Sequence, residues 1–149
     1  MRIEDEIKQE KFDSEYQKLA VNIIFTFHWL QSNQFEFLKE FDLTTQQYNV
    51  LRILRGQHPN SATVTLIKER MLDKMSDASR LVDRLVNKGL VERRICEKDR
   101  RRVDVLITDK GLELLSKIDD TPGMNLNELK SLSENEAAKL NTLLDKLRG

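Results

Sequence analysis

The chain has 149 residues, enough for one domain with a substantial core and too few for two ordinary ones. Its 25 basic and 25 acidic residues cancel, and 39% of the residues are apolar. This balance argues against a disordered tail, which combines low hydrophobicity with high net charge. Five glycines and two prolines favour a mainly helical chain over a turn-rich β-sandwich.

The scarce residue types exclude several kinds of site. One cysteine rules out an intrachain disulfide framework, and with two histidines a four-ligand zinc site is not expected. No segment approaches the roughly 18 apolar residues of a membrane span. The charged N-terminus does not resemble a secretory signal. We therefore expect a soluble, reduced, cytoplasmic protein with no metal, no cofactor and no membrane partner.

The charges are unevenly distributed along the chain. Residues 1–45 carry a net charge of −4, 46–67 of +2, 68–102 of +5 and 103–149 of −3. A basic middle between acidic ends indicates a surface for a polyanion, although a solvated helix face would give the same count.

Two helices are expected in the first third of the chain. Residues from about Phe12 to Lys39 have apolar side chains at helical spacing on more than one face, which predicts burial on more than one side. Thr44 and Gln47 form a capping box for a second helix, and Leu43 can pack against Tyr48.

The basic middle predicts two more helices. Ser61 can cap a short helix from Ala62 to Met71, and Asp73 a longer one from Lys74 to Lys88 that ends at Gly89. At about 100° per residue, the longer helix has an apolar face and an opposite face rich in hydrogen-bonding groups. The apolar face comprises Met75, Ala78, Leu81, Val82, Leu85 and Val86, and the polar face Ser76, Asp77, Arg80, Asp83, Arg84 and Asn87, with Lys74 and Ser79 at the edges.

A β-hairpin and two helices complete the chain. Leu90–Cys96 and Arg102–Ile107 alternate as strands around the charged connector 97–101. Thr108 can cap a helix to about Asp119, and Ser133 with Glu136 forms a capping box for the last helix.

This order of elements is that of a winged helix-turn-helix, and the residues resemble the MarR family of bacterial regulators. The resemblance rests on three runs taken together: Leu43-Thr44-x-x-Gln47-x-x-Val50-Leu51; Arg80-Leu81-Val82-Asp83-Arg84-Leu85 followed by Lys88-Gly89-Leu90-Val91; and Asp99-Arg100-Arg101 followed by Val105-Leu106-Ile107-Thr108-x-x-Gly111. It implies a mainly α fold with a small β-hairpin wing: a winged helix-turn-helix over about 43–107, and dimerisation helices over about 1–42 and 108–149.

The resemblance also implies a dimeric DNA-binding transcriptional regulator, most commonly a repressor, on a pseudo-palindromic operator. The recognition helix would present Lys74, Ser76, Asp77, Ser79, Arg80 and Arg84, with Arg80 as the principal base reader because guanidinium binds guanine bidentately. At the wing, Arg101 would enter the minor groove, Asp99 would shape the tip, Arg100 would add charge, and Arg93 and Arg94 would contact phosphates.

Dimerisation and regulation are further expectations from the resemblance. The residues expected at the dimer interface are Phe12, Tyr16, Leu19, Leu140, Leu143, Leu144 and Leu147. These helices could instead complete a monomer core. A small aromatic ligand could contact Phe25, Phe27, His28 and Trp29, although core or dimer packing also accounts for these residues. A redox-responsive regulator using Cys96, the only thiol, is an alternative.

Two other classes of protein compete with a DNA-binding regulator. An enzyme is disfavoured, because the chain has no glycine-rich phosphate loop and no Ser/His/Asp or metal constellation. A winged helix that binds protein would tend to lose basic residues on its recognition helix and wing, and this chain keeps them. Salt dependence of binding to duplex DNA would separate the two remaining classes.

Overall fold

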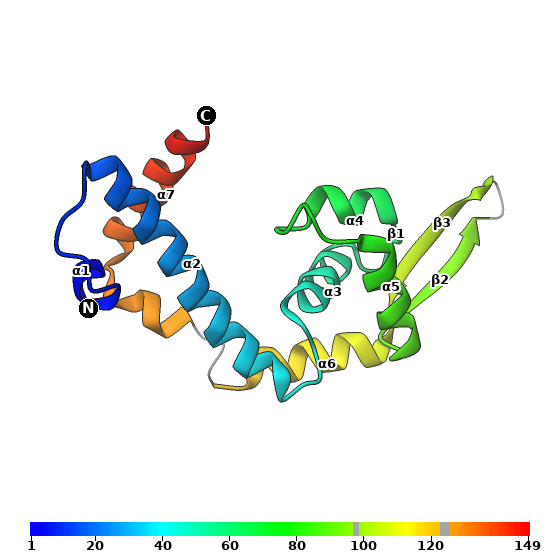
Figure 1. Ribbon diagram of the computed structural model, residues 1–149. Helices are drawn as coiled ribbons and strands as arrows, with labels where there is room; N and C mark the ends of the chain where they lie inside the picture. The colour runs from blue at the N-terminus through cyan, green and yellow to red at the C-terminus, as the bar shows by residue number, and fades with distance from the viewer. Residues whose placement is uncertain (97–98, 123–125) are drawn as a thin grey trace.

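The computed structural model describes the backbone of residues 1–96, 99–122 and 126–149, and the side chains of 1–95, 103–122 and 129–149. The chain forms a helical region that holds both termini and a winged module that ends in the β2–β3 hairpin (Figure 1). The elements are α1 (Ile3–Glu6), α2 (Glu15–Lys39), α3 (Thr45–Gln57), β1 (Ala62–Thr63), α4 (Val64–Arg70), α5 (Ala78–Asn87), β2 (Val91–Cys96), β3 (Asp99–Ile107), α6 (Asp109–Asp120), the 3-10 helix η1 (Leu126–Ser131) and α7 (Glu134–Arg148). The fold is therefore a winged helix-turn-helix with long terminal helices, as expected.

Several helix starts follow directly from their capping residues. Thr44 and Gln47 form the expected capping box at α3, and Ser133 and Glu136 form the one at α7. The Thr108 hydroxyl accepts from the Gly111 amide and begins α6. These three helices start where the sequence predicts.

The first long helix begins three residues later than predicted. The Ser14 hydroxyl accepts from the Gln17 amide, so α2 starts at Glu15 and Phe12 precedes it. The short helix α1 was not expected from the sequence. Its Ile3 is buried, and Glu4 accepts a 2.6 Å hydrogen bond from the Lys18 ammonium on α2.

The third predicted helix is shorter and is preceded by a strand. Ala62 and Thr63 form β1, which pairs antiparallel with β3, and Thr63 rather than Ser61 caps α4. A two-residue strand has no periodicity to detect, so the sequence indicated only the hairpin. The sheet has three strands in the order β1-β3-β2.

The fourth predicted helix begins four residues later, at Ala78 instead of Lys74. Asp77 is its N-cap, because the Asp77 carboxylate accepts from the Arg80 amide at 3.1 Å. Asp73 instead organises the turn before the helix, and Met75, expected in the core, is 93% exposed. The predicted end is correct: Gly89 has φ +71°, the left-handed conformation that glycine adopts without strain.

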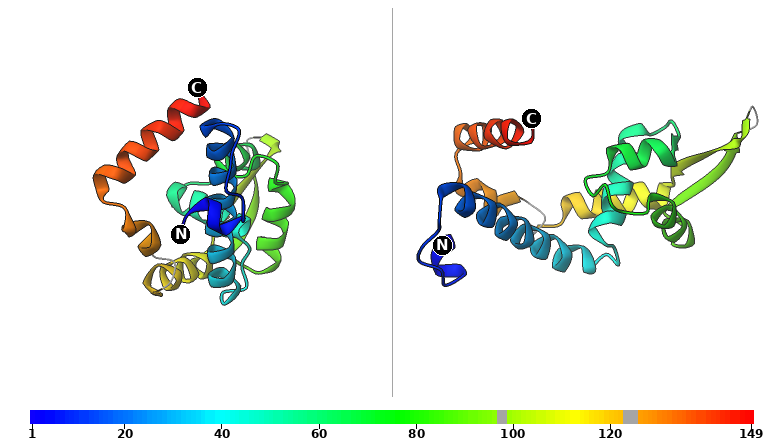
Figure 2. Two further views of the ribbon diagram at one scale, coloured as in Figure 1. Left: turned by 60° about the vertical axis from the view of Figure 1, so that its left-hand side comes forward. Right: turned by 45° about the horizontal axis from the view of Figure 1, so that its top comes forward.

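The core lies in the winged module and reaches only one end of the terminal helices. Leu38 is the only described residue of α2 that is buried, and α7 has none. Figure 2 shows the hairpin and α7 at opposite extremes of the molecule. The largest fully buried side chains are Leu38, Val50, Leu51, Leu54, Ile67, Met71, Val82, Leu85, Val105, Leu115 and Ile118.

Candidate nucleic-acid interface

Helix α5 has one buried and one exposed face, and the exposed face is rich in hydrogen-bonding groups. Ala78, Val82 and Leu85 are buried against the rest of the module. Arg80 and Arg84 lie on the opposite face, and the Arg80 side chain is 80% exposed. α5 packs against α3, α4 and β2, so these guanidinium groups project from a helix held on several sides.

Asp77 has two interactions at the start of α5. It caps the helix, and one carboxylate oxygen lies 3.5 Å from Nε of Arg80. This contact is made by Nε, and the terminal nitrogens of a guanidinium are the donors that can form the paired hydrogen bonds that a guanine edge accepts.

Lys74 and Ser76, expected within the recognition helix, lie in the turn before it. The Ser76 hydroxyl donates to the Asp73 carboxylate at 2.7 Å, and the Met75 amide donates to the same carboxylate at 2.9 Å. These hydrogen bonds hold the pKa of Asp73 below its usual value, the Ser76 contact most of all. The Lys74 ammonium donates to the carbonyl of Glu69. Both predicted contacts are therefore part of an ordered turn that leads into α5.

The base of the wing is joined to α5 by Arg93. One terminal nitrogen of Arg93 lies 2.7 Å from the Asp83 carboxylate, and the other donates to the carbonyl of Ser79 at 3.3 Å. Sequence reasoning assigned Arg93 to phosphate and did not pair it with Asp83. Arg93 on β2 and Asp83 on α5 are ten residues apart in different elements, and no sequence pattern indicates that such a pair is in contact. Arg94, by contrast, is largely exposed and pairs with Glu92 on its own strand.

Of the other residues expected at the wing, three belong to strand β3 and Cys96 belongs to strand β2. Asp99, Arg100 and Arg101 begin β3, so the strand starts earlier than the predicted Arg102. Their side chains lie outside the described residues, and so does the side chain of Cys96 at the end of β2. Their roles in DNA binding or redox response stay predictions.

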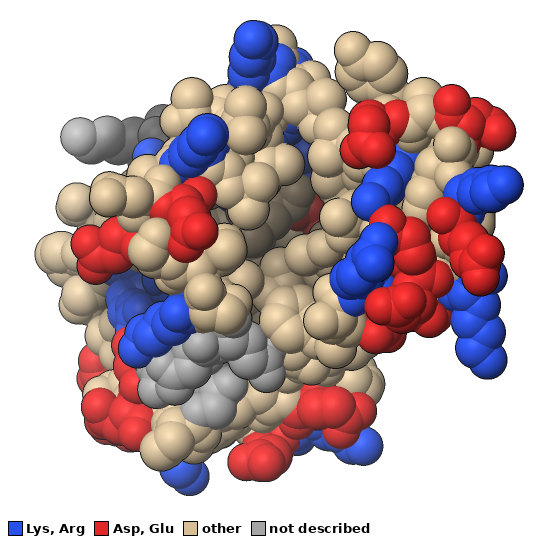
Figure 3. All heavy atoms as spheres, turned by 90° about the vertical axis from the view of Figure 1, so that its left-hand side faces the viewer, with Lys and Arg blue, Asp and Glu red and all other residues tan. Residues whose placement is uncertain are grey.

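The terminal helices expose most of the residues that were expected to mediate dimerisation. Phe12 and Leu144 are half-buried, and the others, which are exposed, are Tyr16, Leu19, Leu140, Leu143 and Leu147. Figure 3 shows this end of the molecule, where uncharged side chains surround a hollow and charged groups gather toward the edges. Within one chain these helices do not complete a monomer core.

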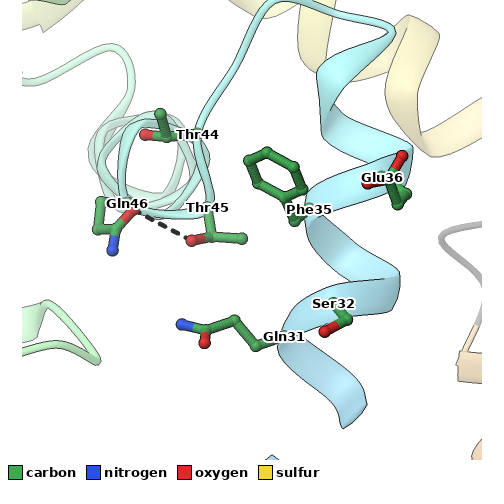
Figure 4. Close-up of a pocket in the computed structure, with 7 residues that line it drawn as sticks. All are labelled: Gln31, Ser32, Phe35, Glu36, Thr44, Thr45 and Gln46. Atoms are coloured by element: carbon green, nitrogen blue, oxygen red, sulfur yellow. Dashed lines mark hydrogen bonds between the residues drawn. The ribbon is translucent and has the colours of Figure 1, made fainter. Parts of the chain in front are cut away.

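A cleft of about 340 Å³ lies where the terminal helices meet the winged module. Gln31 and Phe35 extend from α2 toward the first turn of α3 (Figure 4). The lining residues are Gln31, Ser32, Phe35, Glu36, Thr44, Thr45 and Gln46. It is thus an open cleft lined by polar residue types and one aromatic ring.

The four residues expected to contact a ligand lie elsewhere on α2. Phe25, Phe27, His28 and Trp29 are nearly consecutive, so a helix directs them to different sides. Phe27 and His28 contact each other edge to face at 5.4 Å. None of the four lines this cleft, and their role in ligand binding stays a prediction.

The described residues contain neither a cluster of metal-binding side chains nor a helix that could span a membrane. No group of three or more His, Cys, Asp or Glu side chains in that part of the chain is arranged to hold a metal ion. None of the described helices is long and apolar enough to cross a membrane.

The sequence of the chain is similar to those of known proteins. A family model described as the MarR family matches residues 41–102. The multiple antibiotic resistance protein MarR of Salmonella typhimurium is 30% identical over 113 residues, which cover 74% of this chain and 77% of that protein. The HTH-type transcriptional repressor IacR of Pseudomonas putida is 28% identical over 129 residues, covering 81% of this chain and 76% of that protein.

A solved structure extends the likeness to nearly the whole chain. A mutant MarR from E. coli complexed with operator DNA is 28% identical and has a TM-score of 0.77. The similarity covers 93% of this chain and 99% of that chain, so it includes the terminal helices as well as the winged module.

Proposed function

Since the chain belongs to the MarR family of transcriptional regulators, we propose that it is a dimeric repressor that binds a pseudo-palindromic operator and is released from it by a small-molecule ligand. The observation that carries this proposal is the exposed guanidinium face of α5, held against the wing by Arg93. Such a helix fits the major groove, where base edges present distinguishable donors and acceptors. The similar E. coli structure in complex with operator DNA supports the same partner.

Each basic element has a distinct role in the proposal. Arg80 reads a guanine, aligned by Asp77, and Arg84 and Ser79 extend the contact along the groove. Arg101 enters the minor groove next to Asp99. Lys74, Ser76, Arg94 and Arg100 bind phosphates and so set the position of the helix without specifying sequence.

Arg93 departs from the phosphate role that sequence reasoning gave it. Its guanidinium is engaged by Asp83 and by the Ser79 carbonyl, so it fixes the angle between the wing and α5. In the proposal it is a positioning residue: it lets the minor-groove and major-groove contacts form on one face of the duplex.

The dimer is formed by α2 and α7 of two copies. Exposed large apolar side chains on both helices would be covered by a second chain, and contiguous apolar patches of this kind mark interaction surfaces. Two winged modules joined in this way would read half-sites roughly 34 Å apart, about one helical turn. In the cytoplasm, such a dimer on a promoter blocks transcription, and the relative IacR is named a repressor.

Ligand release uses the junction between the terminal helices and the module. The cleft between α2 and α3 shares Phe35 and Thr44 with a smaller cavity that Asp42 and Lys88 line. The ammonium of Lys88, the C-cap of α5, lies 2.9 Å from the Asp42 carboxylate. A molecule that moves α2 against α3 therefore moves an element bonded to the recognition helix. The ring of Phe35 gives the cleft a surface on which an aromatic ligand can stack.

The test is to select the duplexes that the protein binds from a random pool, and then to measure its affinity for the enriched sequence by fluorescence anisotropy. Arg80→Ala should lose about 1–3 kcal/mol of discrimination at one base pair of each half-site. Arg148→Ala is the matched control, because Arg148 is also an exposed helical arginine paired with an aspartate three residues away. Failure to enrich any sequence, or equal losses in the two variants, would contradict the proposal.

A further inference from the structure

Two large apolar side chains stand almost fully in solvent immediately before the recognition helix. Leu72 is 88% exposed and Met75 is 93% exposed, although both lie between the buried Met71 and the buried Ala78. Single exposed apolar residues are common on protein surfaces, so exposure alone assigns no role. The case for these two rests on how they are held and on what surrounds them.

The backbone holds both side chains outward. The Leu72 amide donates to the Asn49 side chain on α3 at 2.9 Å, and the Met75 amide donates to the Asp73 carboxylate at 2.9 Å. The Ser76 hydroxyl closes the turn on the same carboxylate. These hydrogen bonds fix the backbone of the turn that carries Leu72 and Met75, and on this backbone both side chains are exposed.

The surroundings of the turn suit a duplex. Lys74 lies between the two apolar residues, and Arg80 lies in the first turn of α5. In helix-turn-helix proteins the N-terminal residues of the recognition helix approach the base edges most closely. An apolar side chain at that depth in the major groove has one apolar group to meet, the C5 methyl of thymine.

We propose that Met75 and Leu72 read thymine methyl groups in each operator half-site, beside the base that Arg80 reads. The inference rests on the proposed function and adds a specificity element to it: thymine next to the guanine contact. A protein partner that covers these side chains would be a different surface and is an outcome of the test.

The experiment removes one methyl group at a time from the selected duplex. Replacing a thymine by deoxyuridine leaves every hydrogen bond of the base pair and deletes only the C5 methyl. For wild type, each contacted methyl should be worth about fourfold in affinity, the effect expected for burying one such group. In Met75→Ala or Leu72→Ala, the thymine and deoxyuridine duplexes should bind equally at the corresponding position.

Two further variants make the test specific. Met75→Leu keeps an apolar side chain and should restore part of the thymine preference. Arg80→Ala should weaken binding overall and keep the thymine preference, because it removes a different contact. Met75→Ala and Leu72→Ala both change exposed side chains, and a thermal unfolding curve that matches that of wild type would exclude misfolding.

The outcomes separate the two proposals. If no duplex is enriched in the selection, the proposed function fails. If a duplex is enriched and deoxyuridine changes the affinity of wild type and of both alanine variants equally, the DNA-binding function stands and the thymine inference is overturned. Full operator affinity in both alanine variants would also overturn it, and would leave a protein partner as the alternative occupant of this surface.

Discussion

Gly111 has no side chain, and this lets helix α6 pack closely against the base of the wing. At Gly111, a Cβ would lie 2.4 Å from the Leu90 carbonyl oxygen and 2.7 Å from Cγ1 of Ile107. Both are closer than any normal contact, and one of the two atoms belongs to the backbone, so the helix would have to shift. Gly56 differs, since nothing lies within 4 Å of its added Cβ.

Gly111→Ala should therefore destabilise the chain by about 1–3 kcal/mol, the usual cost of overpacking. Gly56→Ala should stabilise it by up to about 1 kcal/mol, because alanine is the better residue inside helix α3. Urea unfolding of both variants measures the difference. Equal midpoints for the two would mean that the close approach at Gly111 is not a constraint on the fold.

Residue-scale prediction from sequence succeeded for the caps of α3, α6 and α7, and failed for the cap of α4 and for the turn before α5. Thr44 and Ser133 each precede by three residues a Gln or Glu that completes a capping box, and Thr108 accepts from the Gly111 amide three residues on. Two aspartates four residues apart, Asp73 and Asp77, both suit a cap, and the spacing of apolar residues favoured the first. The resulting register placed Met75 on the buried face, whereas in the structure it precedes the helix and is exposed.

At the scale of elements, α1 is attached to α2 by one ion pair with a marked pH dependence. The hydrogen bond from Lys18 lowers the pKa of Glu4 from 4.5 to about 2. A carboxyl whose pKa is lower in the folded state adds stability above its unfolded pKa, and this contribution is lost as pH falls through the folded value. The window in which the Glu4–Lys18 pair weakens therefore runs from about pH 4.5 down to about pH 2.

Glu4→Gln should lower the melting temperature at neutral pH, and the difference from wild type should vanish as pH approaches 2. Arg2→Gln is the control, because Arg2 contacts the same carboxylate at 3.3 Å and is a minor cause of the pKa shift. Calorimetry over this pH range provides the measurement. A difference that stays constant down to pH 2 would show that it does not come from the ionised Glu4–Lys18 pair.

Elements with strong periodicity or a clear cap were predictable, and short or long-range ones were not. The six helices α2 to α7 and the hairpin follow from apolar spacing, capping residues and turn residues. Strand β1 and helix α1 are too short to carry a period, and β1 forms only because β3 offers it an edge. The contact of Arg93 with Asp83 likewise depends on how the hairpin folds back onto α5.

At the scale of the whole molecule, one chain is half of the proposed DNA-binding unit. The terminal helices bury little within the chain and expose apolar side chains at the end opposite the hairpin. The broad apolar surface of the first long helix was readable from the sequence. What covers that surface was not, because periodicity identifies a buried face without identifying its neighbour.

The central claim is that two copies of this chain, joined through α2 and α7, bind one operator through two winged modules. The most direct measurement is sedimentation velocity of a fluorescent duplex that carries the selected sequence, with a scrambled duplex alongside. We predict two chains per selected duplex, weaker binding to the scrambled one, and a steep loss of both between about 50 and 200 mM salt. One chain per duplex, or equal and salt-insensitive binding to both duplexes, would contradict the account.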